Sequence, residues 1–139
     1  MSEKKFSIRR CHDIELVKKL HLETFPTDEW YSNPKAESWV VWLDKKPVGF
    51  CMVSIWDGKY GFLARAGLLK EARGCGLHMR LIKVRESFCR RNGFTKVLTY
   101  TKMDNITSNR NLQKAGFYLY IPQYSYADPD CLYWMKELK

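Results

Sequence analysis

The sequence predicts an α+β fold in a single domain that spans residues 1–139. The main observation is the order of the elements. A strand and helix come first, then three antiparallel strands, a strand–helix–strand unit, another helix and two final strands, and such a mixed order is typical of an α+β sheet. Two further observations support one domain. A chain of 139 residues that is 45% hydrophobic can bury an ordinary core, and no linker, internal repeat or low-complexity tract divides it.

The first half of the chain contains a strand, a helix and two hairpins. Phe6–Arg9 has the pattern of a short strand, and Asp13 is a suitable N-cap for a helix that should end at Phe25-Pro26. A polar and aromatic loop, Thr27–Ser38, follows and has room for a short second helix. Three β-rich runs come next, and the tetrapeptide Asp44–Pro47 and the dipeptide Asp57-Gly58 form the turns between them. These runs are Trp39–Leu43, Val48–Ser54 and Tyr60–Leu69.

The second half begins with a one-sided helix. Its apolar residues recur at spacings of four, three and four, while its charged residues face elsewhere, and this is the period of an amphipathic helix. We expect it to run from Leu77 to about Asn92, because Gly93 is a natural stop. Lys96–Thr101 should form a buried strand after it. The apolar positions are Leu77, Leu81, Val84 and Phe88.

A basic turn bracketed by two glycines stands directly before this helix. Gly74 and Gly76 carry no side chains, so main-chain N–H groups can close on a bound oxygen, and the positive end of the helix dipole attracts phosphate. Arg73 adds a fixed positive charge. The turn lacks the lysine pattern of a nucleoside triphosphate site, and it lacks the three-glycine spacing of a dinucleotide site. It therefore predicts a site for another diphosphate; the alternative is an ordinary helix start.

This turn resembles a motif of a known enzyme family. Arg73–His78, with the sequence Arg-Gly-Cys-Gly-Leu-His, is similar to motif A of the GNAT superfamily of acyl-CoA N-acyltransferases, whose signature is Arg/Gln-x-x-Gly-x-Gly/Ala. The arginine and the central glycine match, and His78 stands where the family has a small residue. Because a six-residue match is weak by itself, a second match at the right distance matters.

The second match lies further along the chain. Asn105–Ser108 followed by Leu112–Phe117 resembles the family's later asparagine, short helix and Gly-Phe, and Leu132–Lys136 resembles its closing strand. The resemblance runs from about Ile8 to the C-terminus. It implies a mixed, mostly antiparallel central sheet of about seven strands, flanked by about four helices. It also implies that the sheet splays open between the fourth and fifth strands, here Tyr60–Leu69 and Lys96–Thr101.

The resemblance further implies that acetyl-CoA is the acyl donor and cosubstrate. In the family, main-chain groups at the end of the fourth strand bind the pantetheine arm and polarise the thioester carbonyl, and here that strand end includes Leu68 and Leu69. Asn105 falls where the family has an asparagine that contacts the pantetheine arm, although simple helix capping is the alternative. The residues that the resemblance assigns to the diphosphate loop are Arg73, Gly74, Gly76, Leu77 and His78.

The same resemblance leaves the proton-transfer groups open. Many members place a tyrosine general acid four residues before the glycine of Gly-Phe, but this sequence has Leu112 there. Ser108, Tyr133 or a bound water is then the source of the proton, and a thiol is acidic enough for its thiolate to leave without strong help. Three carboxylates are candidates for a general base acting through water, and each could equally be a solvent-facing charge. They are Glu23, Asp28 and Glu29.

The charge and the cysteines limit the classes of partner. A net charge of +9 fits a nucleic-acid surface, but it equally fits coenzyme A, which is a polyanion, or solubility alone; nucleic acid is the less favoured partner. The five cysteines are odd in number and widely spaced, so we expect reduced thiols and no metal site. Without an 18-residue apolar run or a signal peptide, we expect a cytoplasmic protein that does not enter a membrane, as a monomer or homodimer.

The function implied is direct transfer of an acetyl group from acetyl-CoA to an amine. The acceptor could be a small molecule, a polyamine, or the N-terminus or a lysine of a protein. Two other functions remain: an acetyl-CoA-binding regulatory or adaptor protein, and a basic nucleic-acid-binding module that uses the Arg73 turn to hold phosphate. Most of the aromatic residues near the expected acceptor groove should pack in the core or at its rim, and a few should line an acceptor pocket. They are Trp30, Tyr31, Tyr118, Tyr120, Tyr124, Tyr126, Tyr133 and Trp134.

Overall fold

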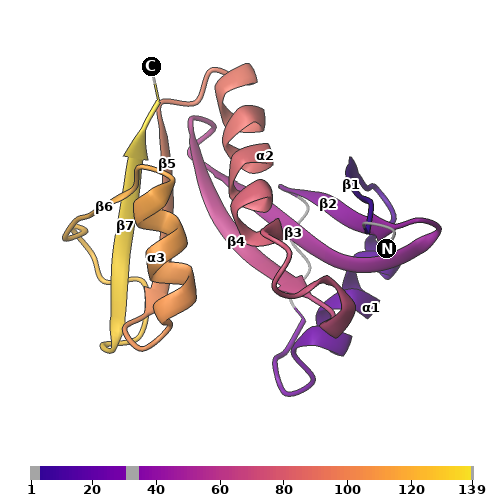
Figure 1. Cartoon of the computed structure of the whole chain (residues 1–139). Helices are drawn as coiled ribbons and strands as arrows, with labels where there is room; N and C mark the ends of the chain where they lie inside the picture. Colours follow the sequence, from indigo (N-terminus) through magenta and orange to yellow (C-terminus); the bar gives the residue numbers. More distant parts are fainter. Residues whose placement is uncertain (1–3, 31–34, 139) are drawn as a thin grey trace. The chain divides into compact units, whose positions relative to one another are not determined.

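The computed structural model describes residues 4–30 and 35–138, and within them it forms seven strands, three α-helices and one short 3-10 turn (Figure 1). The elements are β1 (Phe6–Arg10), α1 (Ile14–Thr24), β2 (Ala36–Leu43), β3 (Lys46–Trp56), β4 (Tyr60–Leu68), the 3-10 turn (Lys70–Ala72), α2 (Leu77–Arg91), β5 (Lys96–Lys102), α3 (Ile106–Lys114), β6 (Tyr118–Leu119) and β7 (Cys131–Glu137). The strand order is β1-β2-β3-β4-β5-β7-β6. The pairs β1–β2, β2–β3, β5–β7 and β6–β7 are antiparallel, and β4–β5 is parallel. The expected mixed sheet of seven strands is confirmed, with three α-helices in the described residues where about four were expected.

The expected loop Thr27–Ser38 is shorter in the structure, because β2 begins at Ala36. Ala36 pairs with Ser54 of β3, so the last three residues of the expected loop belong to the strand ladder. The short second helix expected in this loop and the aromatic candidate Tyr31 involve residues 31–34, which lie outside the described residues.

The chain forms two compact units, residues 1–54 with 64–77 and residues 55–63 with 78–139. In the first unit, α1 packs on β2 and β3 through a buried cluster that includes Val17, Leu20 and Phe50. The expected N-cap is confirmed, since the Asp13 side chain accepts a hydrogen bond from the Leu16 amide at 3.2 Å. The single domain expected from the sequence stays a prediction.

The second unit joins α2, α3 and β7 through a charged contact. Glu86 of α2 is buried and pairs with Lys136 of β7 at 2.7 Å, and the same ammonium donates to the Ala115 carbonyl at the end of α3, also at 2.7 Å. In Figure 1, α3 lies beside β5 and β7. Gly93, with φ of 73°, follows the last turn of α2, so the expected stop is confirmed.

The parallel pairing of β4 with β5 is short. It joins Tyr60–Phe62 to Lys96–Leu98, whereas β4 continues to Leu68 and β5 to Lys102. The ladder thus covers only the first part of both strands, and the expected opening of the sheet between them stays a prediction. Among the described residues, no helix is long and apolar enough to cross a membrane.

Candidate functional site

The turn before α2 has the conformation that its glycines predict. Gly74 and Gly76 have φ of 73° and 74°, a left-handed conformation that costs an L-residue about 1–2 kcal/mol. A Cβ added at either glycine would meet no heavy atom within 4 Å. The turn is therefore open and is not filled by its own side chains. Main-chain amides in such a turn can form a concave site for an anion.

The start of α2 is electrostatically suited to the same anion. Leu77 is the first helical residue and follows Gly76 directly, so the unsatisfied N–H groups of the first helical turn lie beside the glycines. This first turn contains no acidic residue, and His78 lies in it, half-buried. Without a carboxylate there, nothing in the helix start opposes the attraction between the helix dipole and a phosphate.

Arg73 links this turn to the end of β4. Its Nε donates to the Leu68 carbonyl at 3.1 Å, so two of the expected cofactor residues are in direct contact. The neighbouring Leu69 amide donates to the Val48 carbonyl at 2.8 Å. Two of the main-chain groups at this strand end are therefore already paired within the protein. The side chains of Leu68 and Leu77 are buried, as core residues would be.

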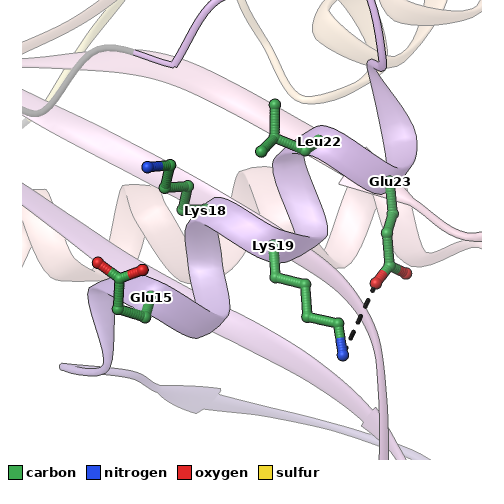
Figure 2. A pocket seen from close by; sticks show the side chains of 5 residues that line it. All are labelled: Glu15, Lys18, Lys19, Leu22 and Glu23. Atoms are coloured by element: carbon green, nitrogen blue, oxygen red, sulfur yellow. Dashed lines mark ion pairs between the residues drawn. The ribbon is translucent and has the colours of Figure 1, made fainter.

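The three candidate bases lie in different surroundings in the first unit. Glu23 is on the exposed face of α1, 4.0 Å from Lys19, at the edge of a shallow pocket of about 360 Å³ (Figure 2). Asp28 pairs with Arg65 of β4 at 3.4 Å. Glu29 is exposed in the segment that follows α1. Glu23 and Asp28 thus have cationic partners, and all three carboxylates stay candidates for the base.

His21 was not singled out from the sequence, and it is the least expected residue of the first unit. Its exposed fraction is 0%, and its ring lies 5.4 Å from Trp30, 5.7 Å from Phe25 and 6.1 Å from Phe50 between centroids. Neither ring nitrogen has a hydrogen-bond partner of good geometry among the described residues. Burial, and then the Arg65 charge, lower the pKa of His21, while the main chain of Asp28 and Glu29 opposes this weakly. The imidazole is therefore neutral at pH 7. Its place on the buried face of α1, four residues after Val17, was the signal for its burial.

In the second unit, Asn105 and Ser108 meet at the start of α3. The Asn105 Oδ1 accepts a hydrogen bond from the Ser108 amide at 3.3 Å, so Asn105 is the N-cap of α3. Capping was the alternative to a pantetheine contact, but the two roles are compatible because the Asn105 Nδ2 group remains a donor. The first turn of α3, like that of α2, contains no acidic residue.

Tyr133 lies on β7 with its hydroxyl engaged by the β6–β7 loop. The hydroxyl accepts from the Ala127 amide at 3.0 Å and donates toward the Ala127 carbonyl at 3.5 Å. Its proton is thus directed at the protein's own main chain. Leu112, at the position of the family's tyrosine, is buried in the second unit. Ser108, the other candidate acid, lies in the first turn of α3.

The second unit has an aromatic cluster centred on Tyr126 of the β6–β7 loop. The Tyr126 ring lies 4.7 Å from Tyr133, 5.3 Å from Trp56 and 6.1 Å from Tyr100 between centroids, and its hydroxyl is 2.6 Å from that of Tyr120. Burial, and then the hydrogen bond with Tyr120, raise the pKa of Tyr126. A pocket of about 380 Å³ adjoins this cluster, and the described residues that line it are all uncharged. It is lined by Leu119, Tyr120, Ile121, Pro122, Ser125, Cys131, Leu132 and Tyr133.

All five cysteines are free thiols, as the spacing predicted. Cys75, between the two glycines of the turn, is exposed, and Cys11 is half-buried. The other three are buried, and burial raises the pKa of the Cys89 thiol to about 11. In the part of the chain that the structure describes, no three His, Cys, Asp or Glu side chains come together as metal ligands.

Comparison with known proteins identifies the family. The model of the acetyltransferase (GNAT) family matches residues 7–117, so the chain belongs to the GNAT acetyltransferase family. No match was found among curated protein sequences. Three solved structures show the same fold at low identity.

An acetyltransferase of Bacillus subtilis in complex with CoA is 14% identical, with a TM-score of 0.78, over 97% of this chain and 100% of that one. A GNAT family acetyltransferase of Elizabethkingia anophelis with acetyl-CoA bound is 13% identical, with a TM-score of 0.76, over 98% and 100%. The ribosomal-protein-S18-alanine N-acetyltransferase of Escherichia coli is 12% identical, with a TM-score of 0.77, over 96% and 94%.

Proposed function

We propose that this protein is an N-acetyltransferase that moves an acetyl group from acetyl-CoA directly to an amine. The observation that carries the proposal is the open, left-handed glycine turn at the acid-free start of α2, in a chain that belongs to the GNAT family. The structures with CoA or acetyl-CoA bound in two proteins of the same fold support the choice of cosubstrate. We further propose that the protein acts in the cytoplasm as a monomer or homodimer.

In the first unit, the amides of the turn Gly74–Leu77 would bind the diphosphate, with His78 next along the chain as a further donor. Arg73 would add positive charge and hold the Leu68 carbonyl in place. The remaining main-chain groups near Leu68 and Leu69 would bind the pantetheine arm, although the Leu69 amide would first have to leave Val48. In the second unit, the Asn105 Nδ2 group would donate to a pantetheine carbonyl.

The reaction needs a neutral amine, and we propose that Glu29 removes its proton through a water. The amine nitrogen attacks the thioester carbonyl carbon, the new C–N bond forms, the C–S bond breaks, and the coenzyme A thiolate leaves. The nitrogen carries a positive charge after the attack, and it gives its extra proton to water to become the amide. Ser108, Tyr133 or a bound water returns a proton to the thiolate, and this step needs little help because a thiol ionises near pH 8.5. Cys75 is exposed in the turn and takes no part as a nucleophile.

The acceptor would enter by the aromatic side of the second unit. The 380 Å³ pocket beside Tyr120 and Tyr133 is in the size range of small-ligand sites, and its lining residues within the described part of the chain are uncharged. An amine carried on an uncharged, flat or amphipathic body fits such walls better than a polycation does. We therefore favour an aromatic or apolar primary amine, or the N-terminus of an apolar peptide, over a polyamine.

Titration calorimetry with acetyl-CoA tests this proposal, and the chain offers a matched control. Gly76→Ala and Gly93→Ala place a Cβ at nearly identical φ, 74° and 73°, and neither Cβ meets an atom within 4 Å. Both variants should therefore lose about 1 kcal/mol of stability. Only Gly76→Ala should weaken acetyl-CoA binding, by about tenfold or more. No binding by the unaltered protein at millimolar acetyl-CoA would end the enzyme hypothesis.

Two observations favour the rival function, a regulatory or adaptor protein that binds acetyl-CoA without turnover. The usual acid is replaced by the buried Leu112, and the Tyr133 hydroxyl is engaged with Ala127. Release of free thiol over a panel of apolar and aromatic amines separates the two functions. Binding of acetyl-CoA with no amine-dependent thiol release would support the rival.

A further inference from the structure

The segment between β5 and α3 is held by a side chain that the sequence motifs do not include. Asn109 lies one turn into α3, and its Nδ2 donates to the carbonyls of Lys102 and Met103 at 3.3 and 3.2 Å. Its Oδ1 accepts a hydrogen bond from the Thr101 hydroxyl. One amide thus bonds to three groups of the strand end and of the segment that leads to Asn105.

The orientation of the Asn109 amide is fixed by a residue further away. The Trp134 indole N–H of β7 donates to the Thr101 hydroxyl oxygen at 2.9 Å. An indole can only donate, so the hydroxyl proton is left for Asn109, which must present its oxygen to Thr101 and its NH₂ to the two carbonyls. Trp134 is 2% exposed, so this chain of hydrogen bonds starts in the core and ends at the surface segment.

The segment has little packing of its own to fix it. Met103 is 54% exposed and Asn105 is exposed as well. The segment also has main-chain anchors, since the Met103 amide donates to the Asp130 carbonyl at 2.9 Å and the Asn105 amide to the Lys102 carbonyl at 3.0 Å. The Lys102 carbonyl therefore accepts from both Asn105 and Asn109. The Lys102 ammonium adds ion pairs with Asp128 and Asp130 at 3.2 and 3.1 Å. Loss of the Asn109 side-chain amide would remove the donor to the Met103 carbonyl and one of the two donors to the Lys102 carbonyl, so this part of the segment would be less firmly held.

We propose that Asn109 is a positioning residue for coenzyme A: it holds residues 102–105 in the conformation in which Asn105 meets the pantetheine arm. The inference rests on the proposed function and adds to it a residue that positions the coenzyme A site. With the Asn105 Oδ1 committed to the Ser108 amide, its Nδ2 is the group that can donate to a ligand carbonyl. A small rotation of the segment would turn that donor away, and Asn109 prevents this rotation.

Asn109→Asp tests the proposal with almost no change of shape. The carboxylate keeps an oxygen for Thr101 but places a second oxygen against the carbonyls of Lys102 and Met103. We expect the Kd for coenzyme A to rise about tenfold, the effect of one lost hydrogen bond of about 1.4 kcal/mol. The Kd for 3′-phospho-ADP, which lacks the pantetheine arm, should change less than about twofold, because the turn at Gly74–Gly76 is untouched.

Asn92→Asp is the matched control. The Asn92 Nδ2 also donates to a main-chain carbonyl, that of Phe88 at 2.8 Å, in the same unit but at the end of α2. It should lower stability by a similar amount and leave both dissociation constants unchanged. Thr101→Val should weaken coenzyme A binding as Asn109→Asp does. Thr101→Ser keeps the hydroxyl, so its coenzyme A binding should equal that of the unaltered protein. This pair carries the test should Asn109→Asp fail to fold.

Three outcomes have distinct meanings. If coenzyme A binding is unchanged in Asn109→Asp and Thr101→Val, the positioning role is wrong. If coenzyme A and 3′-phospho-ADP weaken equally, the substitutions act through general destabilisation and the role is again wrong. If the unaltered protein binds neither ligand at millimolar concentration, the proposed function fails and takes this inference with it.

Discussion

The His21 side chain shows how one residue can link packing to pH. It is fully buried against three aromatic rings, with neither nitrogen hydrogen-bonded in good geometry, and burial lowers its pKa. In the unfolded chain the imidazole would ionise near its ordinary pKa of about 6.5. Below that pH the unfolded state takes up a proton that the folded state takes up only at lower pH. Stability is therefore full above pH 6.5 and falls as the pH drops toward the folded-state pKa.

Replacing His21 with leucine should remove this dependence. Leucine has a similar volume and no polar atom to leave unsatisfied, so at pH 7 we expect a melting temperature equal to or above that of the unaltered protein. Between pH 7 and pH 5 the unaltered protein should lose melting temperature more steeply than His21→Leu. Thermal melts by circular dichroism at several pH values measure this. Parallel pH profiles for the two proteins would contradict the assignment.

At the same scale, the sequence predicted some site residues and not others, for physical reasons. Gly74 and Gly76 could be identified because a left-handed backbone restricts the residue type, and their φ values confirm it. The partner of the Tyr133 hydroxyl could not be identified, because it is a main-chain group of Ala127 that any residue would supply. Asn109 was missed for a similar reason: an asparagine inside a helix does not indicate a structural role until its partner Thr101 is known.

At the scale of elements, the Tyr126 ring is a central contact of the β6–β7 loop. Tyr126 is 37% exposed, yet its ring lies against those of Trp56, Tyr100 and Tyr133, and its hydroxyl bonds to Tyr120. Ala127, the next residue, is bonded to the Tyr133 hydroxyl. Tyr126 and Ala127 should therefore fix the middle of this loop, while Lys102 pairs with Asp128 and Asp130 nearer its end.

Tyr126→Ala should loosen this loop without unfolding the protein. Loss of a partly buried aromatic ring should cost about 2 kcal/mol, below the range for a fully buried ring. Tyr126→Phe keeps the ring and should cost about 1 kcal/mol or less, since it loses only the hydroxyl pair. Hydrogen exchange at the Ala127 amide should rise strongly in the alanine variant and little in the phenylalanine variant.

Tyr124 provides the control for this experiment. It belongs to the same loop and is 77% exposed, so Tyr124→Ala should leave the exchange of Ala127 unchanged. Equal effects of the two alanine substitutions would show that the loop has no special anchor at Tyr126.

The elements themselves were largely predictable, and the exceptions come from long-range pairing. The N-cap Asp13 and the stop at Gly93 are local signals, and both are confirmed. The start of β2 is not local. Ala36–Ser38 was expected in a polar loop because its sequence is polar, but pairing of these residues with Met52–Ser54 extends the strand. Because the pairing partners lie well beyond a short window of sequence, the local sequence of Ala36–Ser38 could not predict this pairing.

At the scale of the whole molecule, the net charge of +9 has two competing explanations: binding of coenzyme A and binding of nucleic acid. The exposed face of α2 carries much of it in the second unit, with Arg80, Lys83, Arg90 and Arg91. Arg90 pairs with Glu86 at 2.9 Å, so part of this face is already neutralised. A small polyanion such as coenzyme A needs only the positive end of one helix and a few cations. A nucleic acid needs many cations along a continuous surface.

Thermal shifts with two polyanions separate these explanations. Acetyl-CoA at 100 times its Kd should stabilise the protein by about 2.7 kcal/mol, a rise of several degrees in melting temperature. A 20-base-pair DNA duplex at the same charge concentration in 150 mM salt should give no rise. Stabilisation by DNA that vanishes with salt, with none by acetyl-CoA, would favour the nucleic-acid module instead.

The exposure of Cys75 gives the protein a built-in attachment point for a dye. Three of the other thiols are shielded from solvent and one is half-shielded, so a maleimide fluorophore at limiting concentration should react first at this position. The label would be attached within the turn that is proposed to bind the diphosphate of acetyl-CoA. Its emission would then report ligand arrival in real time, and association rates could be followed without introducing any new cysteine.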